Sequence, residues 1–392
     1  MPLSSPKPDF VIVEPCRTCC DYFARALDQA GRLRFLAVGT RRGVNGVLAE
    51  NTRLKPAVGL VAYAGARVLS PFLAVSLRHH LHPWMDRWAK RQMQPGDHII
   101  SSYGYANECF KFARAHGGKT FLDGGNSHPD NFWNIITEEH RRWNCSYPPI
   151  SRHHYERSLA MMEYVDYVLS PSSYVTRSFL ERGFKPEQIL RNVYPVDLSC
   201  FSPPREPRPA SRPLTLICTG SLSLRKGTPY LLEAFRLVRS KIPGARLLLT
   251  RFFEDNNMRP ILPRYQDLPV EWSPPLPHSQ LAERLRSADI FILPSLEDGF
   301  ALTVTEALAC GLPVITTPNT GASDLIQSGV NGEVVPIRDP QAIADAVLKW
   351  ADRILAPGWR PCVWANAELL SFEHFEREFL EQLRRLNLAG PA

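Results

Sequence analysis

The segment PSLEDGFALTVTEALACGLPVI, residues 294–315, contains the pattern that decides the fold. It begins where the apolar run 290–294 ends, passes through an acidic loop that contains a glycine, and enters an apolar stretch at 304–310. Gly311 and Pro313 end that stretch as helices commonly end, and a second strand-like run follows at 314–316. The segment therefore predicts strand, loop, short helix and strand, which is the repeating unit of a parallel sheet.

The same alternation of short apolar runs and helical patterns extends in both directions from this segment. In the second half, strands are predicted at 214–219, 246–250, 290–294 and 314–316, and helices at 228–241, 280–287, 304–310 and 341–353. In the first half, strands are predicted at 10–13, 34–38, 98–102, 120–123 and 167–170, and helices at 19–30, 105–116 and 152–165. Strands that alternate with helices predict doubly wound parallel sheets.

A proline-rich stretch without periodicity, 203–213, divides the two series and is predicted to be a linker. The predicted organisation is a first α/β domain at 1–202, the linker, and a second α/β domain at 214–365. The remaining residues, 366–392, contain a helical pattern that is expected to pack back on the first domain. Because ligands of such sheets bind beyond the carboxyl ends of the strands, the main site is expected in the cleft between the domains.

Composition narrows the class of protein and its partners. The 392 residues carry a formal charge of +7, and residues 1–205 hold 26 Lys and Arg against 18 Asp and Glu, so that half has a net charge of +8. A one-sided basic field favours an anionic partner or membrane surface, and a solvated surface tuned for solubility is the alternative. Nine cysteines and no cleavable apolar N-terminus favour a reduced, cytoplasmic location.

A basic loop with glycines at both ends, residues 220–227, lies between a predicted strand and a predicted helix. Gly220 allows a ligand to approach the backbone, and the next helix offers its positive end to an anion. Arg225 and Lys226 stand beside it. The loop thus indicates phosphate binding, with an exposed basic turn as the alternative; it matches neither the P-loop nor GxGxxG.

The acidic loop of the opening segment has the chemistry of a sugar site. Carboxylates accept hydrogen bonds from hydroxyl groups, and free N–H groups at the start of a helix hold a diphosphate. The alternative for Glu306 is a capping box with Thr303, because Thr-x-x-Glu is that signature.

This segment closely resembles the E-x7-E motif of retaining GT-B glycosyltransferases of the "glycosyl transferases group 1" type. In that family the second Glu holds the nucleotide ribose and the first contacts the transferred sugar. Aligned on this motif, Glu306 takes the second position and Asp298 the first, with the neighbouring Glu297 as the other candidate.

The basic loop looks like the same family's G-R-x5-K-G segment, in which Arg and Lys grip the diphosphate. Lys226 matches the lysine, whereas Ser221 stands at the arginine position, so Arg225 or Arg251 is expected to supply the second charge. The resemblance covers roughly 165–355. It implies two Rossmann-like domains and these donor-binding residues: Gly220, Ser221, Arg225, Lys226, Glu297, Gly299, Phe300, Ala301, Leu302 and Glu306.

The first half offers fewer signals. His128 follows the predicted strand 120–123, near the point where the family often has a histidine that contacts the sugar; a loop histidine with a structural hydrogen bond is the alternative. The family's glycine pair after the first strand is replaced by 15–20, PCRTCC, whose cysteines have no partner pair at zinc-finger spacing. Inert thiols are favoured there, with Arg17 as a candidate phosphate contact.

The apolar stretch 58–77 contains Arg67 and Pro71. A membrane span is disfavoured, and an amphipathic surface helix and a core-facing helix both remain open.

The resemblance implies a retaining, metal-independent hexosyltransferase that takes its sugar from a UDP- or GDP-sugar and needs no cofactor. The catalytic candidates are Lys226, Asp298, Glu306 and His128. The acceptor is expected to be a glycan, a lipid-linked compound or another hydroxyl compound, in polysaccharide or glycolipid synthesis at the inner face of a membrane. The alternatives are a catalytically idle nucleotide-sugar-binding module and a nucleic-acid-binding protein, although no finger, RNP or helix-turn-helix pattern supports the latter.

Overall fold

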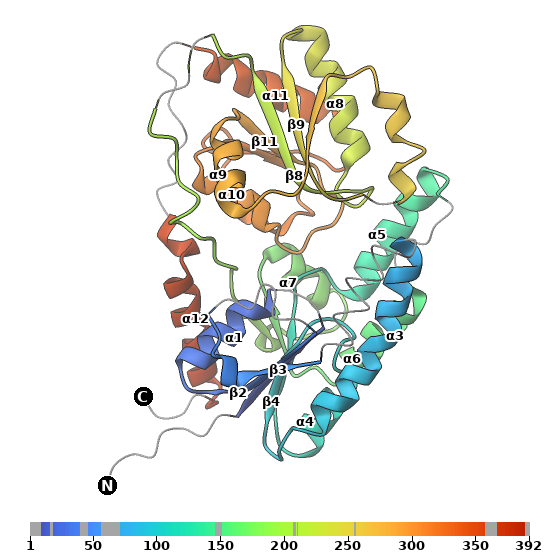
Figure 1. The fold of residues 1–392 in the computed structure, drawn as a ribbon, viewed down its shortest axis with the longest axis vertical. Coiled ribbons are helices and arrows are strands. Elements are labelled where there is room, and N and C mark those ends of the chain that lie inside the picture. The colour runs from blue at the N-terminus through green and yellow to red at the C-terminus, as the bar shows by residue number, and fades with distance from the viewer. Residues whose placement is uncertain are drawn as a thin grey trace.

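The computed structural model describes residues 9–15, 19–39, 46–55, 71–145, 151–206, 209, 211–254, 256–356 and 367–388, without the side chains of 71–80, 251–254 and 256. The chain forms two α/β domains, one above the other in Figure 1. Each domain is built on one parallel sheet.

The N-terminal domain contains a seven-stranded sheet in the order β3-β2-β1-β4-β5-β6-β7. Its strands are β1 (Phe10–Glu14), β2 (Leu33–Val38), β3 (Thr52–Leu54), β4 (His98–Ser101), β5 (Thr120–Asp123), β6 (Tyr167–Ser170) and β7 (Ile189–Arg191). Its helices are α1 (Cys20–Gln29), α3 (Pro71–Lys90), α4 (Asn107–Ala115), α5 (Pro129–Arg142), α6 (Arg152–Met162) and α7 (Ser173–Leu180).

The C-terminal domain contains a six-stranded sheet in the order β10-β9-β8-β11-β12-β13. Its strands are β8 (Thr215–Leu222), β9 (Arg246–Glu254), β10 (Val270–Ser273), β11 (Ile290–Leu293), β12 (Val314–Thr316) and β13 (Gly332–Val334). Its helices are α8 (Thr228–Lys241), α9 (His278–Arg286), α10 (Leu302–Ala309) and α11 (Pro340–Ile354), and the chain continues to α12 (Phe372–Arg385).

Every printed pairing between neighbouring strands is parallel, which confirms the predicted pair of doubly wound sheets. The strand order reverses between β1 and β4 in the first sheet and between β8 and β11 in the second. A crevice opens beyond the carboxyl ends of the strands at such a point, and ligands of this architecture bind there. Each domain therefore presents one such point, and both motif loops of the sequence follow strands at the second.

Most predicted elements lie within a few residues of the observed ones, and four short strands were not predicted. These four are β3, β7, β10 and β13, which have three or four residues each and lie toward the sheet edges. The helices α3, α5 and α7 were also not predicted as such. Strands this short have too few positions to show a periodic pattern.

Two helices cross from one domain to the other. Helix α12 lies beside α1 in the N-terminal domain (Figure 1), where Phe23 packs on Phe375 and Phe379 at ring distances of 5.1 and 4.9 Å. Helix α5 belongs to the N-terminal domain, but Trp143 and Cys145 at its end pack on the core of the C-terminal domain. The end of α5 thus joins the two domains, and α12 brings the end of the chain back to the first one.

The apolar stretch 58–77 lies mostly outside the described residues, and its last seven residues form the first turns of α3. Among the helices that the structure describes, none has both the length and the apolar character needed to cross a bilayer.

Candidate active site

The acidic and basic loops lie side by side at the point where the second sheet reverses its strand order. The basic loop leaves β8 and the acidic loop leaves β11, which are neighbours in the sheet. The amide of Leu296 donates a hydrogen bond of 2.8 Å to the carbonyl oxygen of Arg225, which joins the two loops directly. Strand β8 extends through Ser221, so this residue belongs to the strand end rather than to a free loop.

Glycine is required where the basic loop turns into helix α8. Gly227 has a φ of 68°, in the left-handed region, and a Cβ atom there would lie 2.0 Å from the carbonyl oxygen of Pro294. Any larger residue would push the two loops apart. This contact explains why Lys226, directly before the glycine, faces the acidic loop.

Lys226 and Asp298 form an ion pair between Nζ and Oδ2. Burial alone would raise the pKa of Asp298, but the charges of Lys226 and Arg225 hold it below the ordinary value. The Asp298 carboxyl is therefore ionised at neutral pH, although the residue is only 6% exposed. The pair therefore places a cation of the basic loop next to an anion of the acidic loop.

Arg225 bridges the acidic loop and the N-terminal domain. Its Nε donates to Glu297 Oε2 at 2.8 Å, and one terminal nitrogen donates to Asn126 Oδ1 at 2.6 Å. Glu297 is fully buried and accepts from both the amide and the hydroxyl of Ser127, at 3.0 and 2.9 Å. Glu297 thus serves the contact between the domains, whereas Asp298 is the acid that faces Lys226.

Gly299 and Phe300 lie where the acidic loop touches the N-terminal domain. A Cβ atom on Gly299 would lie 2.2 Å from the carbonyl oxygen of Gly125. The hydroxyl of Ser172 donates to the Gly299 carbonyl at 2.6 Å, and the Phe300 ring meets Tyr194 edge-on at 5.5 Å. The loop therefore fits against the first domain only because residue 299 has no side chain.

Helix α10 starts two residues earlier than the predicted range 304–310. Its N-cap is Ala301, which has a φ of 67° and makes no side-chain cap, and Leu302 opens the helix. A capping box needs Thr303 at the N-cap, so that interpretation of Glu306 is wrong. Glu306 lies on the partly exposed side of the helix, near Cys310, whose thiol pKa is raised to about 12 first by burial and further by the Glu306 charge.

His128 is the N-cap of α5. Its Nδ1 accepts from the amide of Asp130 at 3.2 Å, and its ring packs edge-on against Phe179 at 5.2 Å. Burial lowers the pKa of His128 to about 4, so the ring is neutral at physiological pH. These contacts are those of a histidine with a structural hydrogen bond, while the next residue back, Ser127, reaches the acidic loop.

Several polar residues of the first domain were not selected from the sequence. Asn126 and Ser127 bind the acidic loop, and Glu14 and Asp123 end strands β1 and β5 as buried acids. A usable signal was present, because an acid at the carboxyl end of a buried strand faces the ligand edge of a parallel sheet.

Some of the residues predicted to contact a ligand are not among the described residues, or have no described side chain. Cys16 and Arg17 are outside the described residues, and Arg251 pairs with Gly220 in the sheet although its side chain is not described. Within the described part of the chain, no group of three or more His, Cys, Asp or Glu is arranged to hold a metal ion.

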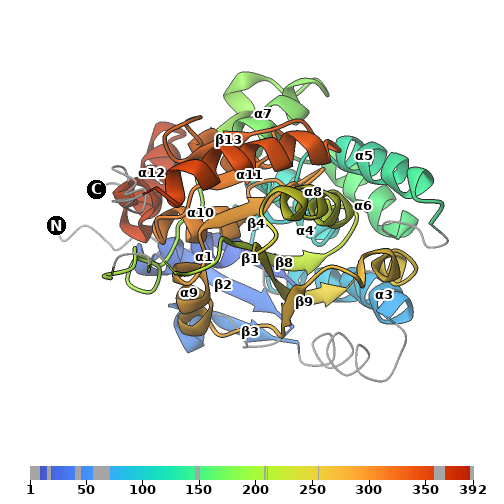
Figure 2. The same ribbon diagram turned by 90° about the horizontal axis from the view of Figure 1, so that it is seen from above.

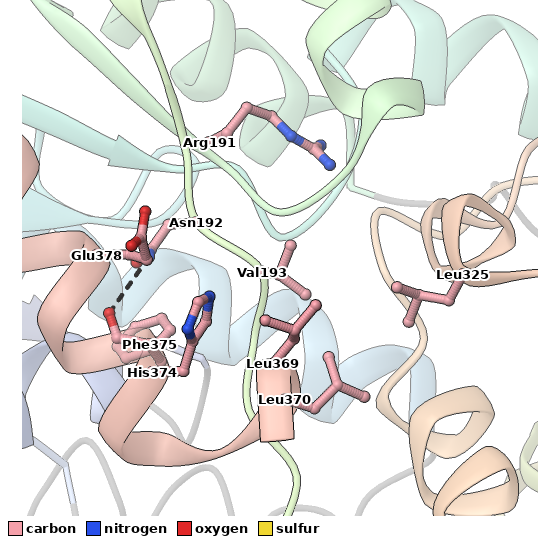
Figure 3. A pocket seen from close by; sticks show the side chains of 9 residues that line it. All are labelled: Arg191, Asn192, Val193, Leu325, Leu369, Leu370, His374, Phe375 and Glu378. Atoms are coloured by element: carbon pink, nitrogen blue, oxygen red, sulfur yellow. Dashed lines mark hydrogen bonds between the residues drawn. The ribbon is translucent and has the colours of Figure 1, made fainter. Parts of the chain in front are cut away.

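A separate hollow of about 210 Å³ lies at the connection between the domains (Figure 3). It is lined by the end of β7 and the segment after it, by Leu325 of the C-terminal domain, and by the residues just before and within the first turns of α12. Its residues are Arg191, Asn192, Val193, Leu325, Leu369, Leu370, His374, Phe375 and Glu378. None of the predicted site residues lines it. It is therefore distinct from the loops described above.

The two sheets, the cleft-facing loops and the returning C-terminal helix define a GT-B architecture. Residues 213–353 match the family model described as "Glycosyl transferases group 1". The match lies within the second domain, the part of the chain that contains both motif loops.

Curated relatives match part of the chain. WcaL of Salmonella typhimurium, named as a colanic acid biosynthesis glycosyltransferase, is 29% identical over 177 residues, which is 43% of each chain. A D-inositol 3-phosphate glycosyltransferase of Arthrobacter sp. is 33% identical over 170 residues, 40% of this chain and 38% of that protein. The chain thus matches less than half the length of these relatives.

Solved structures share the fold over nearly the whole chain. Sucrose-phosphate synthase from Thermosynechococcus elongatus has a TM-score of 0.69 and 17% identity, covering 98% of this chain and 100% of that one. HepE of Anabaena, solved in complex with UDP and glucose, has a TM-score of 0.64 and 12% identity, covering 96% and 99%. At these identities the likeness shows the fold, and both domains take part in it.

Proposed function

We propose that this protein is a retaining, metal-independent glycosyltransferase that moves a hexose from a nucleotide-sugar to a hydroxyl acceptor. The observation that carries the proposal is the meeting of Lys226 and Asp298 at the sheet's reversal point, within a domain that matches the glycosyl transferases group 1 family. A cation for the diphosphate and an acid for the sugar are there held side by side.

The departing diphosphate is the group that most needs stabilisation. Negative charge develops on it as its bond to the anomeric carbon breaks, and fixed cations and helix N-termini stabilise such charge without a metal ion. Lys226 has this role, together with the free amide groups at the start of α10, the helix that follows the acidic loop. Arg225 already binds Glu297 and Asn126, so its part is to hold the acidic loop in place.

The acids of the motif divide their tasks. Glu306 binds the ribose of the donor, as the family motif implies, and Asp298 contacts the transferred sugar. Asp298 is favoured over Glu297 because the Glu297 carboxylate is fully buried between Arg225 and Ser127. His128 remains a candidate sugar contact of the first domain.

The donor is a UDP- or GDP-sugar, and the acceptor is a glycan or a lipid-linked compound. HepE was solved with UDP and glucose, and WcaL is named for colanic acid biosynthesis, which direct the proposal toward cell-surface polysaccharide synthesis. The net charge of +8 on residues 1–205 supports work at an anionic membrane surface in the cytoplasm.

The proposal is tested with a panel of nucleoside diphosphates and their sugars. The correct nucleoside diphosphate raises Tm, because a ligand at 100 times its Kd adds about 2.7 kcal/mol to the free energy of unfolding. Consumption of UDP-glucose, UDP-galactose and GDP-mannose is then measured. Lys226→Ala is expected to lower turnover by about 100-fold or more.

Lys241→Ala is the matched control, because this lysine is exposed at the other end of α8. It is expected to leave turnover unchanged. Binding of a nucleoside diphosphate without consumption of any nucleotide-sugar would instead support an idle binding module, and near-normal turnover of Lys226→Ala would contradict the assignment of the lysine.

A further inference from the structure

The N-terminal domain holds a cluster of polar groups at its own reversal point, which the donor site does not use. Glu14 ends β1, Ser102 directly follows β4, and Asp123 ends β5. These three strands are neighbours at the centre of the sheet, and the order reverses between the first two. This is the place where a ligand of the first domain is expected.

The groups of the cluster are tied together by hydrogen bonds. The amide of Ser102 donates to Glu14 Oε1 at 2.7 Å, and its hydroxyl donates to Asp123 Oδ2 at 3.4 Å. The Cys20 thiol lies 3.1 Å from Glu14 and 3.3 Å from Asp123, and the Tyr194 hydroxyl donates to Asp123 Oδ1. Both oxygens of Asp123 are therefore engaged.

One position in the cluster is not engaged. Glu14 is 0% exposed, and its Oε2 has no hydrogen-bond partner among the described residues. A buried polar atom without a partner costs about 1–3 kcal/mol, so its retention at the ligand edge of the sheet points to a partner supplied from outside the protein.

The cluster adjoins the donor site. Tyr194, which binds Asp123, packs edge-on against Phe300 of the acidic loop at 5.5 Å. The Cys19 thiol lies close enough to both Asp123 and Asp298 for their charges to raise its pKa, after the larger effect of burial. A molecule bound at Glu14 would therefore lie near the acidic loop. In Figure 2, which is seen from above, β1 and β4 lie below β8 and α10 of the C-terminal domain.

We infer that Glu14 binds a hydroxyl group of the acceptor next to the one that reacts, and that the reacting end of the acceptor is an uncharged polyol. Asp123 is a positioning residue, because it acts on Glu14 through Ser102 and Cys20 and through its charge. The inference rests on the proposed function and names the acceptor class. An anionic reacting end would lie close to the negative charge of Asp123 and is disfavoured by repulsion.

The protonation of the pair fits this role. Burial, together with the Asp123 charge, raises the pKa of Glu14 to about 8, whereas the pKa of Asp123 is raised to about 6 by burial. At pH 7 Glu14 carries its proton and donates it in a hydrogen bond, while Asp123 is ionised. The titratable groups that interact with the pair are Cys19, Cys20, Tyr103 and Tyr194, and Cys19 also senses the charge of Asp298 from the C-terminal domain.

The experiment measures transfer from UDP-glucose, UDP-galactose and GDP-mannose to octyl glycosides of glucose, galactose and mannose, and to octyl glucuronide as the anionic counterpart. The acceptor KM is followed from pH 6 to 9.5 in the wild type and in Glu14→Gln, Glu14→Ala and Asp123→Asn. Asp97→Asn is the control, because this buried acid lies at the opposite end of β4. Tm and the Kd of the nucleoside diphosphate report folding and the donor site.

In the wild type, the acceptor KM is expected to rise above pH 8, where Glu14 loses the proton that it donates. Glu14→Gln retains a hydrogen-bond donor at every pH, so its acceptor KM at pH 7 stays within about threefold of the wild type and does not rise above pH 8. Glu14→Ala raises the acceptor KM about tenfold or more with an unchanged Kd for the nucleoside diphosphate. In Asp123→Asn, the rise in KM moves to lower pH. The control variant keeps the wild-type profile.

The inference is overturned if Glu14→Gln retains the alkaline rise in KM, if octyl glucuronide is preferred, or if the protein consumes a donor yet transfers to no neutral glycoside. The absence of any donor consumption or nucleoside diphosphate binding would instead overturn the proposed function, and the inference with it.

Discussion

The buried carboxylate of Glu139, on helix α5 of the N-terminal domain, accepts a hydrogen bond of 2.6 Å from Nε of Arg338 in the C-terminal domain. Its other oxygen accepts from the Tyr230 hydroxyl at 2.6 Å and from Trp143 Nε1 at 2.8 Å. On another part of the interface, Asp324 of the C-terminal domain pairs with Arg191 at 3.0 Å. The two domains are therefore joined by ion pairs as well as by the loops of the site.

Glu139→Gln is expected to destabilise the protein by about 1–3 kcal/mol, because it leaves the largely buried Arg338 guanidinium without its closest carboxylate. Urea unfolding measures the effect. Glu138→Gln is the matched control: this neighbour also lies 3.3 Å from Arg338, but its side chain is 52% exposed. The control is expected to change stability by less than about 0.5 kcal/mol, and equal effects of the two variants would contradict a special role for the buried pair.

Asp298→Asn is expected to strengthen nucleoside diphosphate binding and to weaken turnover. The Asp298 carboxylate forms an ion pair with Lys226 and repels the phosphates. The neutral asparagine side chain leaves the charge of Lys226 available to the diphosphate. We expect the Kd for the correct nucleoside diphosphate to fall about three- to tenfold, as measured by calorimetry, while consumption of the nucleotide-sugar drops.

Asp345→Asn, at an exposed position of α11, is the control for a general change in charge. It is expected to alter neither quantity. A Kd of Asp298→Asn equal to or weaker than that of the wild type would show that the carboxylate does not compete with the diphosphate.

The sequence predicted the two sheets well because their central strands are continuous buried runs, such as Ile290–Leu293. It also identified the two loops that meet at the reversal point, since glycines and charged residues that directly follow a strand of a parallel sheet commonly bind ligands. Gly299 is an example of a contact that the sequence could not predict. Its partner is the carbonyl oxygen of Gly125, 174 positions away in the chain, and no local pattern announces such a contact.

The division of work between Glu297 and Asp298 could not be predicted for the same reason. The two acids are adjacent in the sequence, but their side chains leave the loop in different directions, one to Arg225 and Ser127 and the other to Lys226. The buried pair of Glu14 and Asp123 was likewise visible only as two strand ends, because its significance depends on the order of the strands.

Gly299→Ala is expected to lower the free energy of unfolding by about 1–3 kcal/mol and to weaken donor binding, because the added Cβ atom meets backbone of the other domain at 2.2 Å. Thermal unfolding and nucleoside diphosphate titration measure the two effects. Gly244→Ala is the matched control, since a Cβ atom there has no neighbour within 4 Å. If Gly299→Ala behaved like Gly244→Ala, the tight contact between the acidic loop and the first domain would be disproved.

The raised pKa of Glu14 makes the stability of the protein depend on pH. This pKa is about 8 in the folded protein against an ordinary value of 4.5, and burial is the main cause. The folded state therefore binds the proton more tightly than the unfolded state, so the contribution of Glu14 to stability falls as pH rises from about 4.5 to about 8 and is constant outside that window.

Glu14→Gln cannot titrate, so the difference in unfolding free energy between wild type and variant measures this contribution alone. We expect the wild type to lose stability relative to Glu14→Gln between pH 5 and pH 8, as followed by urea unfolding at each pH. The control is Asp298→Asn, because the pKa of that acid is lowered: it lies below 3.8, and its contribution changes only at more acidic pH. A difference between wild type and Glu14→Gln that stays constant from pH 5 to 8 would mean that Glu14 is already ionised in the folded protein.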